Sequence, residues 1–68
     1  MIRLKVKEIA EAQGFNQSSL SRASDIHFTT IKWIFRDPYK GISTLTLDKL
    51  AKALKVSPSD LIEFDPDK

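Results

Sequence analysis

The feature that most constrains this chain is a very short connection between two short helices. The residue pattern predicts helices at 17–24 and 28–36, which leaves only residues 25–27 between them. Two helices of eight and nine residues joined by about three residues cannot lie antiparallel along their whole length, so they cross steeply as in a helix-turn-helix. In the second helix Ile31 and Ile34 belong to an apolar stripe that must face the core. The opposite face of that helix is then free to bind a partner.

Further helices follow from apolar residues at helical spacing, which predict segments at 2–13, 44–54 and 58–63, the first ended by Gly14. Four helix starts share one signal: an apolar residue, a capping-type residue, and an apolar residue four positions further on. The capping positions are Asn16, His27, Ser43 and Ser57. Such a side chain accepts a backbone N–H that the first helical turn leaves unpaired. Strand-like alternation is not sustained anywhere. We therefore expect an all-α fold, a compact five-helix domain spanning residues 1–68 with a short acidic tail at 64–68.

Composition limits the possible functions. A chain of 68 residues is one small domain, and the absence of cysteine excludes disulfides and Cys-based zinc sites. No apolar run reaches the roughly 18 to 20 residues of a membrane helix, and no signal peptide begins the chain. We expect a cytoplasmic protein without a membrane partner. A single histidine, no phosphate loop and no paired-carboxylate cleft predict a protein that is not an enzyme and binds no cofactor and no metal.

Charge is unevenly distributed although the net value is only +2. Residues 1–40 carry seven Lys and Arg against four Asp and Glu, whereas residues 41–68 carry four against five. A polyanionic partner should therefore meet the first forty residues.

Two separated segments resemble the Cro and phage-repressor family, also called the xenobiotic-response-element type. The run Gln17-Ser18-Ser19-Leu20-Ser21-Arg22-Ala23-Ser24-Asp25-Ile26-His27-Phe28-Thr29-Thr30-Ile31 looks like the helix-turn-helix of that family. The run Leu47-Asp48-Lys49-Leu50-Ala51-Lys52-Ala53-Leu54-Lys55-Val56-Ser57 resembles its fourth helix and the entry to the fifth. The resemblance covers about Leu4 to Phe64 and implies a lambda-repressor-like DNA-binding domain whose third helix enters the major groove.

Four positions depart from the family pattern. Asp25 and Lys55 stand where relatives usually have Gly, so both are expected at positive φ with some strain. Ser21 replaces a usual Ala, a change between small residues. Phe35 stands where many relatives have Glu, and we expect it to pack against the apolar side of the first helix near Ala10.

The resemblance assigns residues to two kinds of DNA contact. Base reading falls to Phe28, Thr29, Lys32 and Trp33, because Thr and Lys hydrogen-bond base edges and aromatic rings pack on the thymine methyl. Phosphate contact falls to Asn16, Gln17, His27, Arg36 and Lys40. For the phosphate-contacting set, the alternative is that these residues only cap a helix or lie in solvent. For the two aromatic residues, the alternatives are core packing and a protein interface. Tyr39 either packs or touches a phosphate through its hydroxyl.

Three functions remain open. The favoured one is a sequence-specific regulator of transcription, a repressor, that binds a palindromic operator in double-stranded DNA as a homodimer through a C-terminal surface including Ile62 and Phe64. The second is the antitoxin of a toxin–antitoxin pair, with the acidic end engaging the toxin. The third is a coactivator-like protein-interaction module that uses the face of Phe28 and Trp33.

Overall fold

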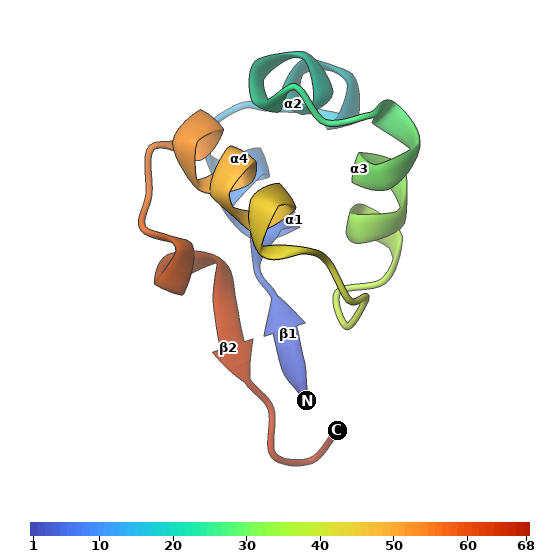
Figure 1. Cartoon of the computed structure of the whole chain (residues 1–68), viewed down its shortest axis with the longest axis vertical. Helices are drawn as coiled ribbons and strands as arrows, with labels where there is room; N and C mark the ends of the chain where they lie inside the picture. The colour runs from blue at the N-terminus through green and yellow to red at the C-terminus, as the bar shows by residue number, and fades with distance from the viewer.

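Three of the five predicted helices form between the predicted residues. A computed structural model describes residues 1–68 (Figure 1). Helices α2 (Gln17–Ser24), α3 (Phe28–Arg36) and α4 (Thr44–Leu54) have the bounds expected from the sequence. The first helix, α1 (Val6–Ala12), is shorter than expected, and Gly14 follows it at a φ of 84°.

The mostly helical fold is confirmed, but the count of five helices is not, because both ends of the chain differ from the expectation. Residues Ile2–Leu4 form strand β1 instead of the first turn of a helix, and Pro58–Leu61 form only a 3-10 turn, η1, before strand β2 (Ile62–Phe64). The two strands pair antiparallel, with Arg3 opposite Glu63. Three-residue strands are too short for alternation to be visible, and their partners lie at opposite ends of the chain, so a local pattern could not reveal them.

Local hydrogen bonds explain where the helices begin. The Asn16 Oδ1 accepts the backbone N–H of Ser19 at 2.8 Å, and the Ser43 Oγ accepts that of Thr46 at 3.1 Å. His27 acts as a cap as predicted, since its Nδ1 accepts the N–H of Thr29 at 3.2 Å. At η1 the capping residue is the donor instead of the acceptor, because the backbone N–H of Ser57 donates to the Asp60 carboxylate at 3.2 Å. The four predicted start positions are therefore confirmed, although the fourth starts a 3-10 turn.

The core lies between the helices and receives residues from every element except β2, whose Ile62 packs against its edge. The side chains with the least exposure are Val6, Leu20, Ile31, Ile34, Leu50, Leu54 and Leu61. Ser24 is the one buried polar residue, and its Oγ donates to the Leu20 carbonyl at 2.6 Å. This hydrogen bond gives the hydroxyl a partner and so offsets the cost of removing it from water.

The turn between α2 and α3 is fixed by backbone conformation and by one side chain. Asp25 adopts the left-handed conformation expected of it, with a φ of 58°. The Ser21 Oγ donates to the carbonyl of Ile26 at 2.6 Å, and Ile26 is buried. These contacts close the turn from both sides and set the direction in which α3 leaves it.

The chain ends meet beside the α3–α4 loop. The N-terminal ammonium of Met1 donates to the carbonyls of Asp65 and Lys68, and the Tyr39 hydroxyl donates to the Asp65 carboxylate at 2.8 Å. This hydrogen bond lowers the pKa of Asp65 and raises that of Tyr39. The Tyr39 hydroxyl is therefore already hydrogen-bonded to a side chain of the protein itself.

Replacing Lys55, which ends α4 at a φ of 57°, by glycine should stabilise the fold. A side chain in this conformation is strained, so Lys55→Gly is expected to raise the free energy of unfolding by about 0.5–1 kcal/mol. Gly41→Ala is the matched control, because its φ is not positive and a Cβ there meets no atom within 4 Å. Chemical denaturation followed by circular dichroism measures both, and a loss of stability in Lys55→Gly would contradict the strain.

Candidate nucleic-acid interface

The exposed face of α3 is the first component of the candidate site. Ile31 and Ile34 are buried, so the opposite side of the helix faces outward. At about 100° per residue, the outward arc runs through five side chains. Their order around the helix is Phe28, Lys32, Arg36, Thr29 and Trp33. Phe28 and Trp33 are each 46% exposed, so neither is a core residue. The two aromatic residues border the arc, and the polar residues lie between them.

Arg36 and Trp33 contact each other on this face. The guanidinium carbon lies 5.3 Å from the centre of the indole ring, which is the geometry of a cation–π pair. Because the two residues are three positions apart on one helix, the contact forms within α3 alone. It restrains two long side chains on an otherwise solvated surface.

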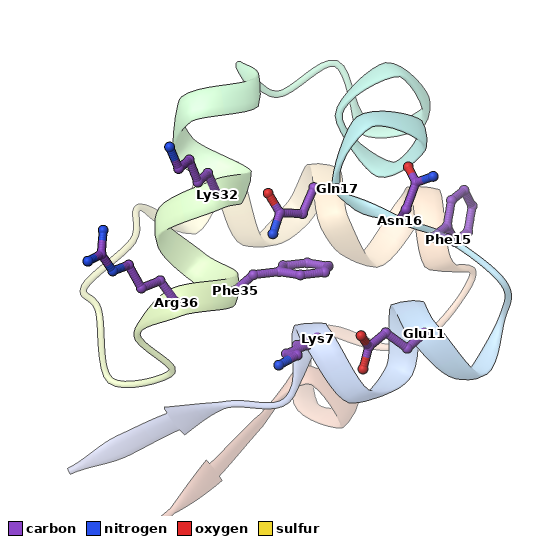
Figure 2. A pocket seen from close by; sticks show the side chains of 8 residues that line it. All are labelled: Lys7, Glu11, Phe15, Asn16, Gln17, Lys32, Phe35 and Arg36. Atoms are coloured by element: carbon purple, nitrogen blue, oxygen red, sulfur yellow. The ribbon is translucent and has the colours of Figure 1, made fainter.

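Next to this face lies an open polar hollow of about 590 Å³, bounded by α1, the start of α2 and α3 (Figure 2). Its lining includes three cationic side chains and one carboxylate, namely Lys7, Lys32, Arg36 and Glu11. Figure 2 shows Gln17 reaching from α2 toward α3, above the ring of Phe35. Phe35 packs against the core from α3, as the sequence predicted. The hollow is thus positively charged and closed at its base by an aromatic ring.

The start of α2 presents unpaired donors to this hollow. Asn16 uses its Oδ1 to cap the helix, which leaves its amide nitrogen without an internal partner. The backbone N–H groups of Gln17 and Ser18 lie in the first turn, where no helical carbonyl can accept them. A helix N-terminus also carries partial positive charge, so this corner suits an anionic oxygen such as that of a phosphate.

Two of the predicted phosphate-contacting residues lie outside the hollow. His27 begins α3, and since its Nδ1 accepts a backbone N–H, only its Nε2 is left to donate to a ligand. Lys40 lies on the α3–α4 loop and lines a different, apolar hollow beside Met1 and Ile2. The structure therefore brings Asn16, Gln17 and Arg36 together but not Lys40.

The sequence of the chain matches the model of a known protein family. The model of the Cro/C1-type HTH DNA-binding domain matches residues 5–67, almost the entire chain. The chain belongs to this Cro/C1-type family. Among curated proteins, no sequence matches the chain significantly. Membership implies double-stranded DNA as the binding partner, and it confirms the resemblance carried by the two segments around α2–α3 and α4.

Two features of other kinds of protein are absent from the structure. It holds no cluster of three or more His, Asp or Glu side chains that could bind a metal ion. None of its helices has the length and apolar character needed to cross a bilayer.

Lys7 is the cationic residue of this hollow that the sequence did not single out. It belongs to α1, and nothing in its local pattern separates it from the other lysines of the chain. The only signal was the excess of positive charge in residues 1–40. Its place beside α3 depends on how α1 packs, which is a tertiary property.

Removing the Arg36 guanidinium should expose the indole of Trp33. Trp33 is the only tryptophan, so intrinsic fluorescence reports on this ring alone. In Arg36→Gln we expect emission at longer wavelength and stronger quenching by acrylamide, because the ring loses its cover. Arg22→Gln is the control, since Arg22 bonds Ser18 on α2 at 2.8 Å and not the indole. Equal quenching in wild type and Arg36→Gln would show that the pair does not form in solution.

Proposed function

We propose that this Cro/C1-type domain is a sequence-specific DNA-binding regulator of transcription, a repressor, that inserts α3 into the major groove. The observation that supports this best is the outward arc of α3, which presents groups able to read bases beside a cationic hollow. The chemistry of these groups is recognition rather than catalysis, so we propose no enzymatic activity. Repression fits because it requires only that the domain occupy the duplex.

Base reading would be divided among four residues of α3. Thr29 and Lys32 hydrogen-bond base edges, and Lys32 suits guanine because its ammonium donates to O6 and N7. Phe28 and Trp33 provide apolar contact. Residues near the N-terminal end of a recognition helix approach the bases most closely, which favours Phe28, Thr29 and Lys32. Arg36 lies on the last turn of α3, closer to the backbone of the duplex.

Phosphate contacts would hold α3 in register. The free donors of Asn16 and Gln17 and the guanidinium of Arg36 border the same hollow, so phosphates of the duplex would be held from both sides of it. Lys7 adds a fourth donor from α1. His27 would contact a phosphate near the start of α3 through Nε2, and Lys40 a more distant one from its loop.

A second copy of the chain would double these contacts on a palindromic operator. The strand pair β1–β2 extends from the body of the domain, and β2 has no partner on its outer side (Figure 1). Ile62 is half-buried against the core, whereas Phe64 is 73% exposed on the same side of the strand. A free strand edge next to an open apolar side chain favours pairing of β2 with β2 of a second copy.

Selection of bound duplexes from a random DNA library at about 0.1 M salt tests the proposed function. Wild type is expected to enrich a short motif, and Lys32→Gln should relax the preference at one position within it. Lys52→Gln is the control, because Lys52 pairs with Asp48 on α4, away from the site. Retention of DNA without any enriched motif would rule out a sequence-specific regulator.

Phe64→Asp tests the second copy. Placing a charge on the free edge of β2 should abolish dimers on DNA and remove the two-fold symmetry from the enriched motif, while the domain stays folded. Leu45→Asp is the matched control, since Leu45 is 63% exposed on α4. Sedimentation velocity of the protein–duplex complex measures the stoichiometry. Two copies bound by Phe64→Asp would place the dimer contact elsewhere.

A further inference from the structure

The side chains of α3 form an unusually restricted set for reading DNA. The nine residues of the helix, Phe28–Arg36, include no Asn, Gln, Asp or Glu. Amide side chains are the usual readers of adenine, and carboxylates accept from cytosine N4. The exposed arc instead offers two cations, one hydroxyl with its methyl group, and two aromatic rings. The cations match guanine and the apolar groups match the 5-methyl group of thymine, whereas the single hydroxyl of Thr29 can bond any base edge.

Resting on the proposed function, we propose that this domain recognises A·T pairs through the thymine 5-methyl group, packed against Phe28 and Trp33. The ligand class is a duplex whose half-site carries two thymines and a guanine read by Lys32. The nearest amide side chains do not replace an adenine reader on α3, because Asn16 and Gln17 lie at the start of α2.

The positions of the two rings set the expected spacing of the thymines. Phe28 and Trp33 are five residues apart, which is about 7.5 Å along a helix axis. Base pairs stack about 3.4 Å apart along the duplex. Where α3 follows the groove, the two rings therefore meet bases about two steps apart. Lys32 is four residues from Phe28, about 6 Å along the axis, so it meets a base beside the one that Trp33 contacts.

The exposure of the rings is consistent with this role. Phe28 and Trp33 are each 46% exposed, and contact with a methyl group would remove part of their apolar area from solvent. The Arg36 guanidinium carbon lies 5.3 Å from the centre of the Trp33 ring and already restrains it. Trp33 therefore loses less conformational freedom on binding DNA than an unrestrained side chain would. A recognition helix that contacted bases only through hydrogen bonds would not need exposed aromatic rings on its outward arc.

Substitution of deoxyuridine for thymidine tests the proposal, because it removes only the 5-methyl group. Wild-type protein first selects duplexes from a random thymidine library. The affinity of the enriched duplex is then measured with deoxyuridine at each thymidine position in turn. We expect about fourfold weaker binding at each of two positions in the half-site, the effect of one buried methyl group. Deoxyuridine outside the half-site is the internal control and should have no effect.

Alanine variants test which aromatic ring contacts each thymine methyl group. Phe28→Ala should lose the sensitivity to deoxyuridine at one position and Trp33→Ala at the other, whereas Leu45→Ala should behave as wild type. The wild-type comparison requires no variant, so a folding defect in either alanine variant does not weaken the test.

The outcomes separate this inference from the proposed function. An enriched duplex that binds equally well with deoxyuridine at every thymidine position would overturn thymine-methyl reading and leave sequence-specific binding intact. Absence of any enriched duplex would overturn both. Loss of the deoxyuridine effect at the same single position in both alanine variants would overturn the assignment of one ring to each thymine.

Discussion

The burial of Ile31 and Ile34 is the constraint on which the candidate site depends. Both side chains are almost fully enclosed by residues from the other helices, so α3 cannot rotate without exposing them. Exposing two isoleucines would cost several kcal/mol, on the order of 1.5–3 kcal/mol each. The core therefore determines which side chains of α3 face solvent. Base reading requires that rigidity, because a recognition helix must hold its side chains in one register.

The short α2–α3 connection links this helix to the rest of the interface. Asp25 accepts a left-handed conformation and Ser21 bonds the Ile26 carbonyl at 2.6 Å, so the start of α2 and the outward face of α3 keep a fixed relation. Donors at the start of α2 and cations on α3 then border the same hollow (Figure 2). The proposed phosphate positioning and base reading would thus come from two helices joined by a single tight turn.

Local chemistry explains what could be predicted from the sequence. Helices α2, α3 and α4 were predicted with their correct bounds because each has its own cap and apolar stripe, and even the histidine cap at His27 is confirmed. Strands β1 and β2 were missed because their pairing joins the two ends of the chain. Lys7 was missed, and Lys40 was grouped with Arg36, because only tertiary packing decides which cations share a hollow. The roles of these side chains on DNA stay predictions.

Chemical-shift mapping of the backbone amides during titration with an enriched duplex tests the central claim most directly. If α3 and the start of α2 form the interface, the largest changes should occur at residues 28–36 and at Asn16 and Gln17, with small changes at the exposed residues of α4. Smaller changes at β2 would accompany pairing of two copies. Dominant changes around the apolar hollow beside Met1 and Ile2, with α3 unaffected, would contradict the account and place the binding surface on the opposite end of the domain.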